Sequence, residues 1–291
     1  MVRIGFDVGG TNIKAGILDG SMNIVAKSMT AFPKESDYSK VVRKMHETAE
    51  ELLSECRLCK NDVSSLGIAV AGAVDVANGI SIKACNLGFY DAPLKDEMKS
   101  YFPGIFVHVV NDAFAATLAE FKKGALKGCS NAMLLTIGTG IGGCVILDGK
   151  LFTGGMKHGF EPGHVTLALD GPLCTCGNKG CIETLCSATW IADKGKANAK
   201  TVIDRAKDGD TESMEIFDEY IENLSTALAS LTAIFDPEII ALGGGVSLAG
   251  DFLFKPLREK VERKSFFKHP YTIVPAKLGN DAGMIGAALA E

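Results

Sequence analysis

The sequence of 291 residues has no long apolar run. No stretch approaches the roughly 18 uninterrupted apolar residues that a membrane-spanning helix requires. The N-terminal residues, MVRIGFDVGG, run directly into an expected strand and lack the apolar core and the cleavage site of a signal peptide. We therefore expect a cytoplasmic protein that has no membrane partner.

The sequence also has no excess of positive charge, since its formal net charge is −5. Nucleic acids and anionic membranes attract basic patches, so we expect no nucleic-acid partner. Pro- or Ser-rich linkers and low-complexity segments are missing as well, although the length allows one large domain or two ordinary ones. Any domain boundary therefore has to be inferred from the pattern of elements.

Strand and helix patterns alternate along the chain. Periodicity predicts helices over residues 38–58, 113–124 and 211–235, and apolar runs predict strands over 65–75, 106–112 and 238–247. Residues 281–291 are expected to form a helix that Asp281 caps. This alternation is typical of an α/β fold in which helices cover layered sheets.

The pattern restarts in the middle of the chain. Residues 131–150, NAMLLTIGTGIGGCVILDGK, repeat the strand, glycine turn and returning strand of residues 3–20. We interpret this as an internal duplication, which predicts two similar lobes around a central cleft. The expected lobes are residues 1–112, joined by the C-terminal helix at about 280–291, and residues 113–279.

Glycines follow three of the expected strands, at residues 9–10, 138–143 and 243–245. Glycine lets backbone amides approach a phosphate closely, because no Cβ intrudes and positive φ values are accessible. Thr11 adds a hydroxyl donor to the first turn, and Asp7 could orient Mg²⁺ through water. Hairpin glycines are also common for structural reasons, and neither a P-loop nor a G-x-G-x-x-G fingerprint is present. Three such turns in series nevertheless favour a bound nucleotide.

Nine cysteines make an odd number, and three of them lie within residues 174–183, CTCGNKGCIE. This spacing leaves a disulfide framework, a redox pair and a metal site open. A reducing compartment disfavours disulfides. The C-x-x-C of Cys56 and Cys59 follows a helical run and has no answering pair, so we interpret these residues as plain thiols.

Several of these segments together resemble a known superfamily. DVGGTNIKAGILD, GTGIGG and the later GGG resemble the phosphate and adenosine segments of the sugar-kinase, Hsp70 and actin ATPases. Within that superfamily, EPGH followed by CTCGNKGCIE is similar to the signature of the ROK family (repressors, open reading frames and kinases). The resemblance runs from Asp7 to the final helix. It implies an actin-like ATPase (ribonuclease H-like) fold whose two lobes have duplicated βββαβα-type cores.

The resemblance further implies a homodimeric, ATP-dependent kinase for a hexose or an N-acylhexosamine. A glucose-type sugar and its 6-hydroxyl are favoured, while N-acetylmannosamine, fructose, allose and β-glucosides stay open. ATP and Mg²⁺ are expected at the strand-end segments, namely Asp7, Gly9, Gly10, Thr11, Asn12, Gly138, Thr139, Gly140, Gly243, Gly244 and Gly245.

Phosphoryl transfer to an alcohol needs a group that accepts the hydroxyl proton. Asp112 stands between an expected strand and the helix AFAATLAEF, where a helix N-cap is the alternative interpretation. The family's catalytic aspartate occupies this Asn-Asp pair, which implies that Asp112 is the base. The implied sugar contacts are Gly72, Asn86, Asn111, Asp112, Glu161, His164 and Glu183. Phe89 stands where many members have Trp, which leaves the rim of the sugar pocket open.

His164 lies ten residues before Cys174, on a loop that can return to the cysteines. His164, Cys174, Cys176 and Cys181 would give the closed Cys₃His set of a structural Zn²⁺ site. With one ring nitrogen on zinc, the other could donate to a sugar hydroxyl. Cys186 lies outside this motif and is expected to be a buried thiol.

Two alternative functions without catalysis are a transcriptional regulator and a sugar-binding protein. A sugar-sensing transcriptional regulator of the same family would carry a helix-turn-helix ahead of the glycine hairpin, and DVGG already begins at residue 7. A non-catalytic sugar-binding protein is disfavoured because Asp112 and both phosphate turns are retained.

Overall fold

The computed structural model describes residues 1–33, 37–84, 86–155 and 159–290. Its contacts divide the chain into two compact units. Unit 1 contains Met1–Lys122, Thr153–Gly159 and Asn280–Glu291, and unit 2 contains Lys123–Phe152 and Phe160–Gly279. Residues 113–122 thus group with unit 1 by their contacts, whereas the sequence suggested a lobe boundary after residue 112.

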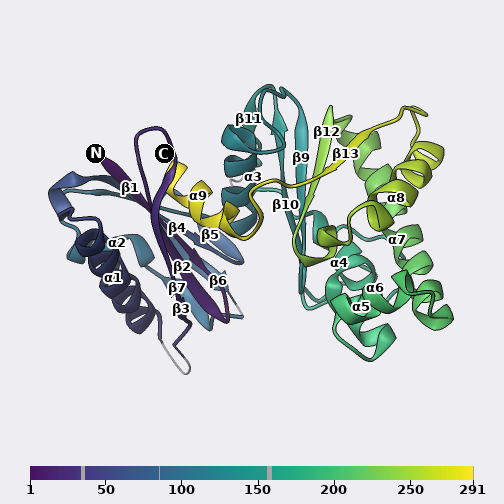
Figure 1. Ribbon diagram of the computed structural model, residues 1–291, viewed down its shortest axis with the longest axis horizontal. Helices are drawn as coiled ribbons and strands as arrows, with labels where there is room; N and C mark the ends of the chain where they lie inside the picture. The colour runs from purple at the N-terminus through teal and green to yellow at the C-terminus, as the bar shows by residue number, and fades with distance from the viewer. Residues whose placement is uncertain (34–36, 85, 156–158, 291) are drawn as a thin grey trace. The chain divides into compact units, whose positions relative to one another are not determined.

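Unit 1 is built on a five-stranded sheet with the order β3-β2-β1-β4-β8 (Figure 1). These strands are β1 (Val2–Val8), β2 (Asn12–Leu18), β3 (Ile24–Ala31), β4 (Val63–Val70) and β8 (Phe106–Asn111). The first three strands are antiparallel neighbours, and β4 and β8 run parallel to β1. A small antiparallel sheet contains β5 (Ala73–Asp75), β6 (Ile80–Ala84) and β7 (Phe89–Ala92).

The helices of unit 1 are α1 (Tyr38–Glu55), η1 (Lys60–Asp62), α2 (Leu94–Tyr101), α3 (Asp112–Lys123) and α9 (Ala282–Leu289). The apolar stripe of α1, which includes Val41, Met45 and Leu52, shares one core cluster with Ile4 and Phe6 of β1. Since side chains alternate along a strand, Gly5 faces the opposite side of the sheet.

Helix α9 covers that opposite face at very close range. Gly5 and Gly67 are register partners on β1 and β4. A Cβ atom on Gly5 would overlap the carbonyl oxygen of Met284, and one on Gly67 would overlap that of Ala287. Figure 1 shows α9, in yellow, beside these strands. Because Gly5 and Gly67 have no side chains, α9 can lie directly against the backbone of β1 and β4.

Asp281 does not cap α9 as the sequence suggested, because its side chain makes no capping hydrogen bond. Its carboxylate instead accepts a hydrogen bond from Lys27 Nζ at 2.7 Å. The capping prediction was wrong, because Asp281 has φ −92° and ψ −8°, whereas an N-cap residue that bonds through its side chain usually has an extended backbone.

Unit 2 repeats the topology of unit 1, with the order β11-β10-β9-β12-β13 and the same relative strand directions. These strands are β9 (Ala132–Ile137), β10 (Ile141–Leu147), β11 (Lys150–Leu151), β12 (Ile239–Gly243) and β13 (Thr272–Pro275). The duplication that the sequence indicated for one hairpin therefore extends to the whole sheet.

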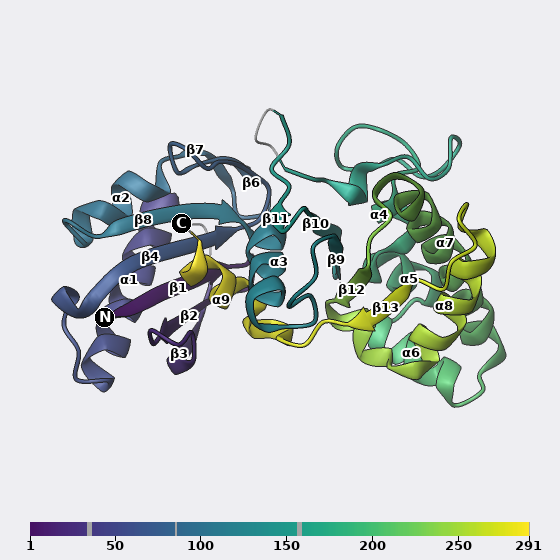
Figure 2. The same ribbon diagram turned by 90° about the horizontal axis from the view of Figure 1, so that it is seen from above.

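The helices of unit 2 are η2 (Pro162–His164), α4 (Ile182–Cys186), α5 (Ala188–Gly195), α6 (Ala199–Lys207), α7 (Thr211–Phe235), η3 (Gly245–Ala249) and α8 (Asp251–Lys264), and η4 (Gly279–Asp281) follows β13. Figure 2 shows α7 and α8 side by side. Tyr220 and Leu224 of α7 share the core of this unit with Met133 and Leu135 of β9. Among the described helices, none combines the length and the apolar character needed to cross a lipid bilayer.

Candidate functional site

The predicted residues of unit 1 emerge at one edge of its sheet. Val8, Val70 and Asn111 are successive register partners at the carboxyl ends of β1, β4 and β8. The residues that follow each strand, including Gly9 and Asp112, therefore leave the sheet side by side. Open α/β sheets bind ligands outside the carboxyl ends of their strands.

The first glycine turn joins β1 to β2, and Gly9 N donates to Asn12 O at 3.0 Å. A Cβ atom on Gly10 would lie 3.2 Å from the carbonyl oxygen of Asn86, so this turn and the predicted sugar contact Asn86 are neighbours. Cys85 lies outside the described residues.

Phe89 is only 1% exposed and packs near Phe32, with ring centroids 6.4 Å apart. It is a core residue rather than part of an exposed rim.

Asn111 caps helix α3. Its Oδ1 atom accepts from Ala113 N at 2.9 Å and from Phe114 N at 3.1 Å. Its Nδ2 atom donates to Gly72 O at 3.0 Å. Asp112 is the first residue of α3, so the alternative interpretation of Asp112 as the cap was wrong, and that role belongs to Asn111. A sugar contact by Asn111 would have to use the second hydrogen of Nδ2.

Asp112 has one short backbone contact, because its Oδ1 atom accepts from Ala113 N at 2.8 Å. Burial raises the pKa of Asp112, the nearby negative charge of Asp7 raises it further, and the bond from Ala113 opposes both. A carboxylate with a raised pKa accepts a proton more readily than a free aspartate does. These are the properties of a general base.

No sequence motif indicated Lys14, which is the register partner of Asp7 across the β1–β2 hairpin. Lys14 Nζ lies 3.1 Å from Asp7 Oδ2, and both side chains are partly exposed. A Cβ atom on Gly283 would lie 2.9 Å from Asp7 Cγ, so the glycine of α9 leaves room for this carboxylate. The hairpin register alone could have pointed to the lysine.

In unit 2, the turn Gly138–Gly140 joins β9 to β10. Gly138 N donates to Gly140 O at 3.0 Å, and Glu183 Oε2 accepts from Ile141 N at 2.9 Å. The sequence resemblance implied that Glu183 contacts the sugar, and the structure adds that one of its oxygens bonds to this turn. Thr189, which no sequence motif indicated either, donates from Oγ1 to Thr139 O at 2.7 Å.

The third glycine segment follows β12, which is parallel and adjacent to β9. Gly244 has φ +86°, and a Cβ atom there would overlap the carbonyl oxygen of Ile137. A pocket of about 210 Å³ opens beside it, lined by Ala188, Ala199, Lys200, Ile203, Asp204, Lys207, Gly245, Val246, Leu248 and Ala249. This mainly apolar lining suits a flat ring system. Most of it comes from α5 and α6, where the sequence carried no recognisable motif.

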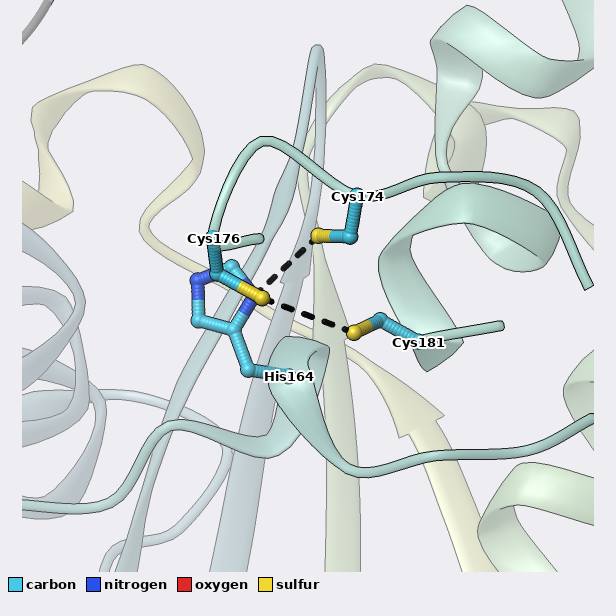
Figure 3. Close-up of side chains that lie close together, drawn as sticks. All are labelled: His164, Cys174, Cys176 and Cys181. Carbon is cyan, nitrogen blue, oxygen red and sulfur yellow. Dashed lines mark hydrogen bonds between the residues drawn. The ribbon is translucent and has the colours of Figure 1, made fainter. Parts of the chain in front are cut away.

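Figure 3 shows His164, Cys174, Cys176 and Cys181 pointing toward one another. Their ligand atoms all lie within 4.8 Å of each other. Cys174 Sγ is 3.6 Å from His164 Nδ1, and Cys176 Sγ is 3.7 Å from Cys181 Sγ. The four side chains that the sequence predicted as ligands therefore form one cluster, which we call the Cys/His cluster.

Two separations within the Cys/His cluster fit a tetrahedral zinc ion. Bond lengths of about 2.3 Å to sulfur and about 2.0–2.1 Å to nitrogen separate two sulfurs by about 3.8 Å, and a sulfur and a nitrogen by about 3.6 Å. The Cys176–Cys181 and Cys174–His164 separations match these values, and the other pairs of ligand atoms lie within 4.8 Å. Tight turns support the loop, since Cys174 N donates to Asn178 O at 2.7 Å and Gly177 has φ +95°. Cys186 is fully buried outside the cluster, as expected.

The other predicted sugar contacts of unit 2 lie beside the Cys/His cluster. Glu161 precedes η2, and His164 N donates to Glu161 O at 3.2 Å. Ile182 N donates to Val165 O at 2.8 Å, which ties the start of α4 to the same segment. Because His164 presents Nδ1 to Cys174, its Nε2 atom is directed away from that thiol.

Two sheets of the same topology with glycine turns at their strand ends define an actin-like ATPase fold. Among solved structures, a ROK family glucokinase from Streptomyces griseus in complex with glucose and AMPPNP is similar, with a TM-score of 0.85 and 30% identity. The match covers 99% of this chain and 98% of that chain.

The sequence comparison agrees with the structural one. The ROK family profile matches residues 3–290. A glucokinase of Thermotoga maritima is 36% identical, over 98% of this chain and 95% of the relative. An N-acetyl-D-glucosamine kinase of Vibrio cholerae is 31% identical, over 98% of this chain and 97% of the relative. The chain belongs to the ROK family.

Proposed function

We propose that this chain is an ATP-dependent sugar kinase that transfers the γ-phosphoryl group of ATP to a hexose or an N-acylhexosamine. The 6-hydroxyl of a glucose-type sugar is the favoured acceptor. Asp112 carries the proposal, because its carboxylate combines a raised pKa with a place at the strand ends beside the first glycine turn. Similarity to glucokinases along nearly the whole chain supports the same chemistry.

Asp112 acts as the general base. The acceptor oxygen attacks the γ-phosphorus, the bond from phosphorus to the β,γ-bridging oxygen breaks, and the hydroxyl proton passes to Asp112. A loose transition state makes the hydroxyl acidic only late in the reaction, so a carboxylate is a sufficient base. Asn111 supports this step by fixing the start of α3, the helix on which Asp112 lies.

The nucleotide is assigned to the glycine turns. Gly9, Gly10, Thr11 and Asn12 in unit 1, and Gly138, Thr139 and Gly140 in unit 2, supply backbone and hydroxyl donors to the phosphates. Gly243, Gly244 and Gly245 border the nucleoside, and the pocket beside Gly245 fits the base. Mg²⁺, held through water by Asp7, would neutralise charge on the phosphates.

The sugar is assigned to Gly72, Asn86, Asn111 and Asp112 of unit 1 and to Glu161, His164 and Glu183 of unit 2. Zinc in the Cys/His cluster would fix the loop that bears the last three residues, which leaves His164 Nε2 for a sugar hydroxyl. The protein would act as a cytoplasmic homodimer, which sedimentation of the purified protein checks.

The experiment is a coupled ADP-release assay at fixed ATP with a panel of glucose, N-acetylglucosamine, N-acetylmannosamine, fructose, allose and a β-glucoside. We expect release that depends on sugar and is fastest with a glucose-type hexose, and a product phosphorylated at the 6-position by NMR. Sugar binding without any ADP release would favour the alternative, a sugar-sensing regulator or a non-catalytic sugar-binding protein.

A further inference from the structure

One short stretch of chain touches both the Cys/His cluster and the phosphate turn of unit 2. Cys181 supplies a thiol to the cluster and directly precedes α4. Glu183 follows on α4, and its Oε2 atom accepts from Ile141 N at 2.9 Å. A Cβ atom on Gly140 would overlap that same oxygen, so the carboxylate packs directly against the turn.

The first two residues of α5, which end this stretch, make two further hydrogen bonds to the turn Gly138–Gly140. Ala188 N donates to Gly138 O at 2.9 Å, and Thr189 Oγ1 donates to Thr139 O at 2.7 Å. The carbonyls of Gly138 and Thr139 are thus held by α5. Within the described part of the chain, the amide N–H groups of Thr139 and Gly140 donate to no backbone acceptor and to no side chain. An anion-binding turn requires backbone N–H groups that are not already bonded within the protein, and this turn has them while its carbonyl groups are hydrogen-bonded to α5.

We propose that the segment Cys181–Thr189 is a brace that holds the turn Gly138–Gly140 in its phosphate-binding conformation. Glu183 and Thr189 are then positioning residues for the nucleotide. The inference rests on the proposed function, because it takes the ligand of this turn to be a nucleotide phosphate. It adds that the Cys/His cluster, through Cys181, acts on nucleotide affinity as well as on the sugar loop.

The negative charge of Glu183 indicates that this residue acts on nucleotide binding by holding the turn rather than by contacting the phosphate. A carboxylate next to bound phosphate repels it, so its negative charge brings no gain in nucleotide binding. Its contribution to nucleotide binding must therefore come from accepting the Ile141 N–H, separately from the sugar contact proposed for the same residue. A glutamine accepts the same hydrogen bond without the charge, whereas an alanine cannot accept it. The two substitutions therefore separate bracing from electrostatics.

The test measures the dissociation constant of MgADP by calorimetry on the zinc-loaded full chain. We expect Thr189→Val and Glu183→Ala to weaken MgADP binding about three- to tenfold, the effect of one lost hydrogen bond. Glu183→Gln should bind MgADP within about twofold of the unaltered protein. The control is Thr226→Val on α7, whose hydroxyl donates to a backbone carbonyl, Glu222 O, at 2.8 Å and accepts from Lys264 Nζ at 2.6 Å, with no bond to the turn.

Unchanged MgADP affinity in both Thr189→Val and Glu183→Ala would refute the brace, and so would an equal loss in Thr226→Val. Thr189 is exposed, so its variant keeps the test available if Glu183→Ala does not fold. In a second arm, zinc-depleted protein from which the chelator has been removed should bind MgADP at least about threefold more weakly. A change confined to sugar affinity would overturn the link to the cluster. Sugar-dependent ADP release by the unaltered protein reports on the proposed function separately.

Discussion

Lys14 Nζ lies 3.1 Å from Asp7 Oδ2 and also donates to the carbonyl oxygen of Asn280 at 3.0 Å. The lysine therefore ties the first hairpin to the segment that leads into α9. It also places a positive charge beside the Asp7 carboxylate, whose negative charge raises the pKa of Asp112.

Replacing Lys14 by methionine should lower kcat/KM for MgATP about fivefold, which corresponds to about 1 kcal/mol for a partly exposed ion pair. The reason is that Asp7 loses the cation that orients it. Lys14→Arg keeps the charge and is expected to retain most of the activity in steady-state assays. Equal losses in the two variants would show that the size of the side chain matters rather than its charge.

Asp112→Asn should lower kcat by about 10²–10⁴-fold, because asparagine cannot accept the hydroxyl proton. The dissociation constant of MgADP is expected to change about twofold or less, and that of the sugar far less than kcat, because asparagine can still bond a sugar hydroxyl. Calorimetry checks both alongside the rate. Full sugar-dependent ADP release by this variant would refute the proposed mechanism.

The same substitution should stabilise the folded protein at pH 7. The pKa of Asp112 is raised in the folded state above its ordinary value of 3.8, so ionising this carboxylate costs more when the chain is folded. The gain from Asp112→Asn should shrink as the pH falls through the raised pKa and vanish below 3.8. Urea unfolding of both proteins from pH 7 downward measures it, and a gain that grows toward acid pH contradicts this account.

Gly67→Ala should destabilise unit 1 by about 3 kcal/mol, because the new methyl group meets the backbone of α9 and forces the helix away from the sheet. Gly20→Ala is the matched control, since a Cβ atom there has no neighbour within 4 Å. Thermal unfolding of the two variants should differ clearly. Similar melting temperatures would mean that α9 shifts at little cost.

The purified protein should contain one zinc ion per chain, which inductively coupled plasma mass spectrometry measures. Cys181→Ser should lose most of this zinc and lower the melting temperature, because a structural zinc site contributes folding free energy. Cys186→Ser, which changes a buried thiol outside the Cys/His cluster, should keep the metal. Retention of zinc by Cys181→Ser would exclude that thiol as a ligand.

Local patterns in the sequence were enough to locate several parts of the fold and of the candidate site. Periodicity placed α7 at its observed residues 211–235, and the motif spacing brought together the four residues of the Cys/His cluster. The strand-end glycines could be recognised because each turn is made by consecutive residues.

Other relationships depend on contacts between distant residues. Glu183 and Ile141 are 42 positions apart, and no local pattern links them. The alternative interpretation of Asp112 as the α3 cap was wrong by one residue, because Asn and Asp are equally good caps and only the hydrogen bonds identify Asn111. The parallel pairing of β4 with β1 and β8 likewise joins segments that the sequence separates.

The position of α9 has a consequence for how the chain folds during its synthesis. Most of unit 1 consists of residues 1–122, yet the glycine-lined face of β1 and β4 is covered by residues 282–289. A ribosome completes the sheet at residue 111 and makes the helix that covers it about 170 residues later, at about 5–20 residues per second. For roughly 10 seconds or more, this face of the unit 1 sheet is therefore not covered by α9. Chaperone binding and misassembly would occur at this exposed face.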